Sequence, residues 1–437
     1  MRITRKAAGA AAATAAVTLV LTACSGGDTE SGDGGGDAEG GDVTLTVAWW
    51  GNDDRAARYE ESIDLFEEAN PNITVQTQFQ DWENYWTARN TEAAGQSLPD
   101  VFQMDLSYLR QYGGTGQLAD LSEYVGSEID TSGFEDALLS SGTIEGAQYG
   151  IPTSQNTLAL FYNQDVLDTI GVDPLEPGYT WDDFNAFIAE ASEAGAGEDP
   201  AIYGSGDYTG TFWFFLQWFL QQGEQPFTED GQLNFDEAAV TEFLNLASEL
   251  REAGQLFPTE RAVQLAPLGG FTSNEAAAEA SWDNFLAGYI SDAGTENIHM
   301  LPMPAGDNGP QQFWKPSMLL SSGANSEHPA EAAELISFLV NDPEVGEIFG
   351  TSKGVPAVAA QRDAMNVEEG SVDATVLEYE EMVAPDVTES APLPVEGFGS
   401  IEAEWMRLAE ELGYGNITVD EFVEQWFAFA NDTVGQS

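Results

Sequence analysis

Residues 43–75 read VTLTVAWWGNDDRAARYEESIDLFEEANPNITV. The first seven of them alternate polar and apolar side chains, which indicates a β-strand. Asn52 or Asp53 can cap the helix that follows, and Pro71 ends that helix. A second alternating stretch then indicates another strand. The segment is therefore predicted to form a strand, a helix and a strand.

The same alternation of strands and helices continues through a helix at 82–94 and a short buried strand at 99–105. This order is typical of a parallel sheet that is covered by helices. In such sheets, ligands bind beyond the carboxyl ends of the strands. The loop Trp49–Arg55 and the side chain of Asp105 follow two of these ends, so we expect both to border a binding site.

Later segments predict the remaining elements. Residues 212–222 are rich in Phe, Trp and Leu and are too short to span a bilayer, which indicates a buried helix. Residues 236–253 place apolar side chains at helical spacing and are predicted to form one amphipathic helix. Other helices are expected at 330–340, 375–383, 401–412 and 419–430, and strands at 158–162 and 298–302.

The chain is strongly acidic. It has 75 acidic and 13 basic residues and a net charge of −62. A charge of this sign repels nucleic acid and anionic lipid, so both are excluded as partners. We interpret the acidity as a means of staying soluble in a salty medium, where charges are screened. A specific cationic partner is the alternative.

The N-terminus has the layout of a secretory signal. Three basic residues precede an apolar run at 7–21, which is shorter than the ~20 residues of a membrane span. Cys24 follows, and it is the only cysteine of the chain. Residues 21–24, Leu-Thr-Ala-Cys, resemble a bacterial lipobox, in which the cysteine becomes the lipid-carrying N-terminus. The alternative is an ordinary signal followed by a free cysteine.

The remaining chain is expected to be a tethered protein of two lobes. Residues 24–42 consist mostly of Gly, Ser, Asp and Glu, which is typical of a flexible linker whose charges repel one another. Residues 43–437 exceed the length that one hydrophobic core usually serves.

Several short motifs occur in an order that one family shares. They are Trp49-Trp50-Gly51 before an arginine-bearing helix start, Leu98-Pro99-Asp100-Val101, Tyr149-Gly150-Ile151-Pro152 followed by Tyr162-Asn163, and Gly354-Val355-Pro356-Ala357. With them, nearly all of 43–437 resembles the bacterial extracellular solute-binding proteins of family 1. These are the sugar-binding components of ABC importers and relatives of maltose-binding protein.

The resemblance implies an α/β fold of two lobes, the type II periplasmic-binding-protein fold, with a ligand cleft between the lobes. Three segments are expected to cross between the lobes, at 152–157, 315–322 and 353–357. The implied division is a signal peptide at 1–23, a tether at 24–42, lobe 1 at 43–152 and 320–353, and lobe 2 at 158–314 and 358–437. Hinge closure around a sugar, a membrane permease as partner and a monomeric state at the outer face of the cell membrane are further implications.

The resemblance also implies ligand-binding residues. Trp50, Asn52 and Arg55 match the ligand loop of Trp-Trp-Gly members, which lacks the lysine found in maltose-binding protein. Asp105 corresponds to a carboxylate that binds sugar hydroxyls, and Trp282 corresponds to a tryptophan that stacks on a sugar ring. The further candidates are Gln155, Asn156, Trp213, Asp283, Lys315 and Phe398, the last in a loop at 392–398 that is expected to close over the cleft.

These residue types suit a sugar, because aromatic rings cover its C–H faces and planar polar groups bind its hydroxyls. Each candidate also has a structural explanation. The tryptophans can be core residues, Asp105 can cap a helix, and Arg55 can pair with a neighbouring carboxylate. Lys315 and Lys353 lie on predicted crossings, where we expect specific carboxylate partners.

Two other functions remain as alternatives. A secreted glycoside hydrolase would need two carboxylates at a set separation, which any acidic chain offers by chance. The same fold could instead bind a cationic small molecule. His299 and His328 have no cysteine partner and lie far apart in sequence, so neither a zinc site nor another cofactor is expected.

Overall fold

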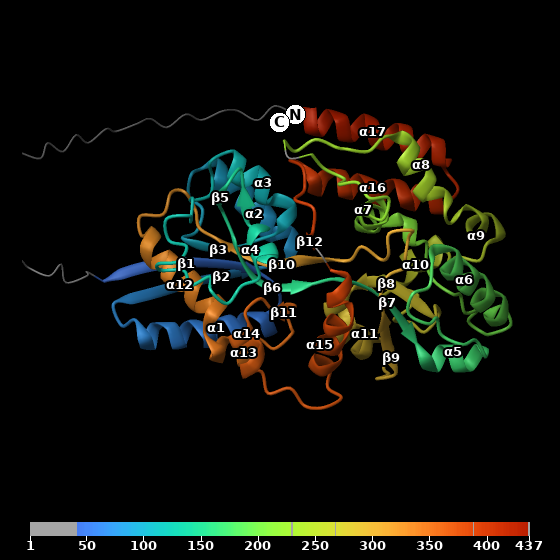
Figure 1. Cartoon of the computed structure of the whole chain (residues 1–437), viewed down its shortest axis with the longest axis horizontal. Coiled ribbons are helices and arrows are strands. Elements are labelled where there is room, and N and C mark those ends of the chain that lie inside the picture. The colour runs from blue at the N-terminus through green and yellow to red at the C-terminus, as the bar shows by residue number, and fades with distance from the viewer. Residues whose placement is uncertain (1–41, 229, 267, 388, 436–437) are drawn as a thin grey trace, which may run out of the picture. The chain divides into compact units, whose positions relative to one another are not determined.

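The computed structural model describes residues 42–435 except 229, 267 and 388 (Figure 1). The described residues form one compact unit. The predicted signal peptide, the lipidation site Cys24 and the tether up to residue 41 lie outside the described residues.

A mixed sheet organises the first lobe. Its strands follow the order β11–β6–β10–β3–β1–β2, and β12 pairs with β10. The predicted parallel arrangement is confirmed for β1, β2 and β3, whereas β10 runs antiparallel to both β3 and β6. The strands span Val43–Trp50 (β1), Ile73–Gln80 (β2), Val101–Met104 (β3), Ile151–Asn156 (β6), Phe313–Ser321 (β10), Val355–Pro356 (β11) and Glu389–Ser390 (β12).

Alternation along β1 explains how this sheet is covered. Leu45 and Trp49 pack into one apolar cluster with helix α1, while Trp50 packs into another cluster with helix α2. Successive side chains of a strand point to opposite faces, so both faces of β1 are buried from Val47 to Trp50, whereas Thr44 on one face is exposed. Helix α1 spans Asp53–Ala69 and α2 spans Trp82–Ala94.

The three predicted crossing segments lie side by side in this sheet as β6, β10 and β11. From β6 the chain passes through Thr157 directly into β7 of a second sheet, whose strand order is β8–β7–β9. The second sheet consists of Leu158–Asn163 (β7), Ala278–Trp282 (β8) and Ile298–Leu301 (β9). A small hairpin of Thr143–Ile144 (β4) and Ala147–Gln148 (β5) precedes β6.

The remaining helices surround the two sheets. Early in the chain they are Leu106–Gly114 (α3), Asp136–Ser140 (α4), Gln164–Ile170 (α5), Trp181–Gly195 (α6), Phe212–Leu220 (α7) and Thr259–Leu265 (α10). Later come Leu286–Ala293 (α11), Pro329–Asn341 (α12), Pro343–Phe349 (α13), Ala359–Ala364 (α14), Val372–Val383 (α15), Phe398–Gly413 (α16) and Val419–Gly435 (α17). Single 3-10 turns occupy Tyr208–Gly210 (η1), Asp283–Phe285 (η2) and Ala384–Asp386 (η3).

The prediction of one helix at 236–253 is wrong. Two helices, α8 (Glu237–Asn245) and α9 (Ser248–Ala253), occupy this stretch. The carbonyl of Leu246 accepts a hydrogen bond of 2.8 Å from the Asn185 side chain. This tertiary contact at the break satisfies a carbonyl that a continuous helix would use internally.

The aromatic stretch at 212–220 forms the predicted buried helix, α7, with Phe212 and Phe215 fully inside. Across the described residues, no helix is both long and apolar enough to cross a membrane.

Candidate ligand-binding site

Lys315 lies at the centre of a cluster that gathers five separate elements. Its Nζ is 3.5 Å from Oδ2 of Asp105, and only 7% of the residue is exposed. Asp105 is the N-cap of α3, since its Oδ1 accepts from the amide of Ser107 at 2.9 Å. One carboxylate oxygen of Asp105, Oδ1, therefore caps α3, while the other, Oδ2, faces Lys315 in the candidate site.

Two indole rings flank the same ammonium group. Nζ of Lys315 is 5.7 Å from the ring centre of Trp213 and 5.5 Å from that of Trp282. The two rings meet edge to face, with their centres 5.6 Å apart. Trp213 is buried, whereas Trp282 is half-buried and keeps part of its ring accessible. A positive charge beside an indole face is a favourable arrangement.

Asn156 adds an amide to this cluster. It is paired with Lys315 in the register of β6 and β10. Its Nδ2 donates to Oδ1 of Asn284 at 3.3 Å, while its own Oδ1 is buried and forms no hydrogen bond with the described residues. Buried polar atoms nearly always have a partner. This oxygen is therefore available to a hydroxyl donor.

The structure adds Glu402 and Tyr108, which sequence reasoning did not single out. Burial, and next the charge of Asp105, raise the pKa of Glu402 to about 7, while Lys315 and a hydrogen bond from Trp213 oppose the shift. Burial, with Asp105 and Glu402 adding to it, raises the pKa of Tyr108. Both side chains therefore lie within electrostatic range of Asp105.

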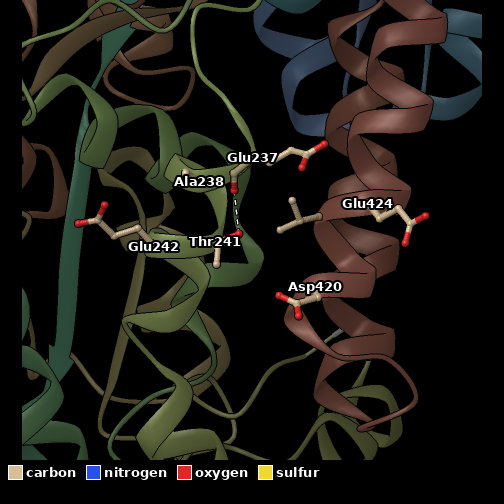
Figure 2. Close-up of a pocket in the computed structure, with 7 residues that line it drawn as sticks. Glu237, Ala238, Thr241, Glu242, Asp420 and Glu424 are labelled. Atoms are coloured by element: carbon tan, nitrogen blue, oxygen red, sulfur yellow. Dashed lines mark hydrogen bonds between the residues drawn. The ribbon is translucent and has the colours of Figure 1, made fainter.

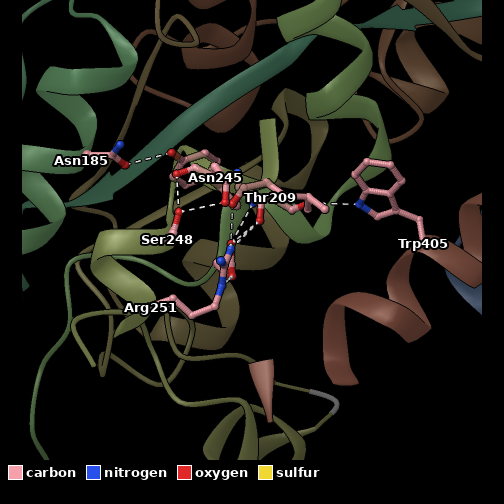
Figure 3. Close-up of polar contacts among 9 residues, drawn as sticks. Asn185, Thr209, Asn245, Ser248, Arg251 and Trp405 are labelled. Carbon is pink, nitrogen blue, oxygen red and sulfur yellow. Dashed lines mark hydrogen bonds and ion pairs between the residues drawn. The ribbon is translucent and has the colours of Figure 1, made fainter. Parts of the chain in front are cut away.

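Helix α16, which carries Glu402, is anchored by a polar network (Figure 3). Trp405 donates from Nε1 to the carbonyl of Thr209 at 3.0 Å. Arg251 holds Thr209 in turn, through its hydroxyl at 3.1 Å, and forms an ion pair of 2.8 Å with Asp207. Because Glu402 lies one helical turn before Trp405, this network holds the stretch of helix backbone from which the Glu402 side chain extends.

The predicted Trp50–Arg55 loop forms a second group. Trp50 is buried, and its ring meets the edges of Trp82 and Tyr85 at 5.0 and 5.4 Å. Asn52 caps α1 by accepting from the amide of Arg55 at 3.0 Å. Arg55 donates to the carbonyl of Trp50 at 3.2 Å and has no ion pair among the described residues.

Trp82 is an aromatic residue that the sequence analysis missed. It is 43% exposed, although three large rings adjoin it. Tyr108, 6.3 Å away between ring centres, connects it to the Lys315 cluster. The signal that could have identified Trp82 is its place as the first helical residue after β2, at the carboxyl edge of the sheet.

Gln155 and Asp283 belong to a buried group at the junction of the two sheets. Gln155 donates to Oε2 of Glu380 at 2.8 Å, and Asp283 accepts from the amide of Thr157 at 3.1 Å. Burial raises the pKa of Asp283 to about 7, and burial followed by the Asp283 charge raises the pKa of Glu380. Gln155 lies on the crossing strand β6, and Asp283 is hydrogen-bonded to Thr157, the residue that follows this strand. Both candidates therefore belong to the junction between the two sheets.

Phe398 does not lie in a loop over the cleft as expected. It begins α16, and its side chain is fully buried. Its ring packs against Phe212 and Trp213 with centres 5.4 and 5.2 Å apart. Phe398 thus packs against Trp213, and no part of its own ring is accessible to a ligand.

Lys353 departs from the expectation of a carboxylate partner. Its Nζ is 3.8 Å from the ring centre of Phe349, and no carboxylate of the described residues forms an ion pair with it. Burial, and next the charge of Arg55, lower the pKa of Lys353 to about 7.

Surface grooves lie elsewhere. One of about 670 Å³ runs between α8 and α17 and is lined by Glu237, Glu242, Asp420 and Glu424 (Figure 2). It contains no aromatic ring and reflects the acidity of the surface. Among the described residues, no group of three His, Cys, Asp or Glu side chains is arranged to hold a metal ion.

Comparison with known proteins identifies the family. A model of the bacterial extracellular solute-binding proteins matches residues 61–370. The chain belongs to this family. Its members are binding proteins, which agrees with the expected class.

Individual relatives are distant. A binding protein of Brucella abortus (strain 2308) is 22% identical over 305 residues, which cover 69% of this chain and 72% of that protein. An arabinooligosaccharide-binding protein of Halalkalibacterium halodurans is 28% identical over 169 residues, covering 38% and 36% of the two chains. A solved periplasmic oligogalacturonide-binding protein from Yersinia enterocolitica, in complex with saturated digalacturonic acid, is similar with a TM-score of 0.75. It is 21% identical and covers 90% of this chain and 99% of its own, so it shows the two-lobe fold.

Proposed function

We propose that this protein is the lipid-anchored, extracellular binding component of an ABC importer, and that it binds a neutral sugar or oligosaccharide without changing it. Membership of the solute-binding family and the arabinooligosaccharide-binding relative support this function. The observation that carries it is the Lys315 cluster, in which two indoles, an acid and an amide from separate elements meet.

Each part of the cluster has a task in sugar binding. The accessible part of Trp282 covers a C–H face of the sugar. Asp105 and the free oxygen of Asn156 accept hydrogen bonds from its hydroxyl groups. A hydrogen bond to a charged group contributes roughly 1.5–3 kcal/mol, more than one between neutral groups. Trp50, Asn52 and Arg55 form the far side of the proposed site, with Trp82 and Tyr108 between the two groups.

The proposed lobes are 43–152 with 320–353 and 158–314 with 358–437. The ligand first binds one lobe, and bending at the three crossing segments then closes the other over it. The permease recognises the closed, monomeric form. Solution scattering should show a smaller radius of gyration for the saturated protein than for the free protein, and an unchanged radius would contradict closure.

A thermal-shift screen over mono-, di- and trisaccharides tests the ligand class. A ligand that binds only the folded state stabilises it by RT ln(1 + [L]/Kd), so the matching sugar raises the melting temperature. The proposal fails if no sugar of the panel does so at millimolar concentration.

Lipid anchoring is tested by cell fractionation. The wild type should sediment with membranes when expressed in a bacterium that processes lipoproteins, and Cys24→Ala should not. Equal distribution of both proteins would argue for an ordinary secretory signal.

A glycoside hydrolase is the second candidate, and one observation favours it. Burial, and next the charge of Asp105, raise the pKa of Glu402 to about 7, and such hydrolysis uses two carboxyl groups, one of which acts as a general acid. Prolonged incubation with the oligosaccharide that binds best, followed by chromatography, separates the two functions. Intact sugar is expected, and the appearance of shorter products would favour the hydrolase.

A further inference from the structure

An exposed indole, that of Trp82, lies at the same edge of the large sheet as Asp105. Trp82 follows the carboxyl end of β2, Trp50 ends β1, and Asp105 follows β3. These three strands are parallel neighbours, so the residues after them gather at the edge where such sheets bind ligands. Trp82 is 43% exposed, the most of any tryptophan among the described residues. Its surface is therefore available at a ligand-binding edge.

No neighbouring ring covers Trp82 by parallel stacking. The rings of Trp50, Trp86 and Tyr108 adjoin it, with centres 5.0, 5.6 and 6.3 Å away. Their planes are inclined to that of Trp82 by 89°, 75° and 58°. Tyr108 differs, because its own ring stacks on Trp86 with the centres 3.8 Å apart. Packing thus holds Trp82 in place while it leaves part of the indole open to solvent.

Tyr108 connects Trp82 with the Lys315 cluster along α3. The amide of Tyr108 donates to the carbonyl of Asp105 at 3.0 Å, and the carboxylate of Asp105 is 3.5 Å from the ammonium group of Lys315. The tyrosine therefore lies one helical turn from the acid of the cluster, and its ring adjoins Trp82. One aromatic residue separates the exposed indole from the candidate site.

A second set of contacts connects Tyr108 with the stacking residue Trp282. A Cβ added to Gly399 would lie 3.2 Å from the Tyr108 hydroxyl oxygen. Phe398, the residue before Gly399, packs against Trp213, and the ring of Trp213 meets that of Trp282. Several residues thus lie between the two accessible indoles.

Trp282 and Trp82 form no ring contact with each other among the described residues. Rings in contact have their centres about 4.5–7 Å apart, so these two are farther apart than that. A single sugar ring that stacks on Trp282 therefore cannot also stack on Trp82. A saccharide that covers both indoles must extend past Lys315 and Asp105.

We propose that Trp82 is a second stacking platform for a sugar unit beyond those at Trp282 and Asp105, so that the site favours oligosaccharides of three or more units. This inference rests on the proposed sugar-binding function. An aromatic ring binds a sugar by covering its apolar C–H face. A dimer occupies the part of the site at Trp282 and Asp105, and the longer oligomer gains the contact with Trp82.

The experiment is calorimetric titration with oligomers of increasing length. The probes are oligomers of one to five units in four series: β-1,4-linked glucose, α-1,4-linked glucose, β-1,4-linked N-acetylglucosamine and α-1,5-linked arabinose. For the series that binds, we expect the affinity of the wild type to rise about tenfold from the dimer to the tetramer, as one added aromatic platform would provide.

Trp82→Ala should remove this gain. Affinity for the tetramer should fall about tenfold, while affinity for the dimer stays within about twofold. Trp82→Phe keeps an aromatic face and should retain most of the gain. Trp282→Ala should weaken binding of the dimer and the tetramer by the same factor, because both cover that ring. The melting temperature of each variant, compared with that of the wild type, shows that the fold is kept.

Phe79→Ala is the matched control. Phe79 is 39% exposed and lies near the end of β2, but its ring stacks against Trp49. Trp49 belongs to the apolar cluster on the α1 side of the sheet, away from Trp50. Removing this ring should leave the affinities for dimer and tetramer unchanged.

Acrylamide quenching of tryptophan fluorescence gives a second readout, because a sugar that stacks on Trp82 shields an exposed indole. Saturation of the wild type with the tetramer should reduce quenching more than saturation with the dimer does. In Trp82→Phe the dimer and the tetramer should protect equally.

Equal affinity of the wild type for dimer and tetramer would overturn the inference, as would a gain that Trp82→Ala leaves intact. An equal loss of the gain in Phe79→Ala would overturn it too, by assigning the gain to exposed apolar surface in general. If no oligomer of any series binds, the proposed function fails and the inference with it. Dimer binding without a gain in longer oligomers removes the inference alone.

Discussion

The two lysines on the crossing strands occupy opposite environments. Lys315 has a carboxylate and two indoles around its ammonium group. Lys353 is 2% exposed, lies against Phe349 and Tyr59, and is repelled by Arg55. The first arrangement suits a binding residue. The second indicates a lysine whose charge costs stability.

Lys353→Met should therefore stabilise the protein. A buried ion carries a desolvation penalty of several kcal/mol that no carboxylate partner among the described residues offsets here, so we expect the apolar side chain to stabilise the protein by about 1–4 kcal/mol. The folded-state pKa of Lys353 is lowered to about 7, so its penalty is complete below that pH and disappears as pH rises toward the unfolded value. Urea unfolding should show a gain at pH 6 that shrinks by pH 9. A loss of stability at pH 6 would contradict this reading.

Trp282→Ala should weaken sugar binding by about 1–3 kcal/mol, as for other aromatic platforms on which planar ligands stack. The half-buried ring is the accessible indole of the cluster. Phe285→Ala is the matched control, because this ring is 48% exposed and lies three residues away. Titration calorimetry measures both. Equal affinity of wild type and Trp282→Ala would make Trp282 a packing residue.

Single residues were predictable where a local rule applied. Asp105 follows a buried strand, and Asn52 precedes an apolar helical pattern, so both caps could be expected from neighbouring residues. Glu402 could not, because its partners lie on α3, α7 and β10 and only tertiary packing brings them to α16. No local sequence pattern distinguishes it from the many other acids of the chain.

At the scale of elements, the junction between the two sheets depends on protonated carboxyl groups. Asp283 follows β8, and Glu380 lies on α15, while Gln155 and Thr157 connect both to the crossing strand. Burial raises the pKa of both acids. The junction is thus held by groups that the unfolded chain would ionise near pH 4.

Stability should fall as pH rises from about 4 to about 7. An acid whose folded pKa is raised contributes stability that is complete below its unfolded pKa and is lost as pH rises through the folded value, here about 7 for Asp283. Each unit of difference corresponds to about 1.4 kcal/mol. Glu380→Gln should flatten the profile of unfolding free energy, and the exposed neighbour Glu381→Gln should not. A profile that Glu380→Gln leaves unchanged would contradict a role for the pair.

Elements were predicted well where apolar periodicity was strong. The strands and helices from β1 to β3 appear as expected, because alternation and helical spacing are both clear there. The break between α8 and α9 escaped prediction, since the apolar pattern runs through Leu246 while Asn185, from α6, binds its carbonyl. The antiparallel pairing of β10 with β3 is likewise a tertiary feature.

At the scale of the whole molecule, Arg110 connects the proposed lobes. It lies on α3, and its Nε donates to the carbonyl of Pro394 at 2.9 Å. Glu145, Asp230 and Glu396 surround the guanidinium group without forming an ion pair with it. Because α3 and Pro394 fall in different proposed lobes, this hydrogen bond should stabilise the closed form.

Arg110→Ala should raise the dissociation rate of bound sugar about fivefold, the equivalent of a hydrogen bond of roughly 1 kcal/mol. Arg407→Ala, which removes an exposed arginine paired with Glu404, is the control. Stopped-flow fluorescence from the tryptophans can follow release for both. A dissociation rate unaffected by Arg110→Ala would place closure elsewhere.

The most direct measurement is calorimetric titration of the wild-type protein with the oligosaccharide found by thermal shift, followed by chromatography of the recovered sugar. The account predicts saturable binding of one sugar per protein molecule and recovery of that sugar unchanged. Failure of every saccharide to bind, or its recovery as shorter products, would contradict a receptor that grips a carbohydrate between Trp282 and Lys315 without breaking a bond.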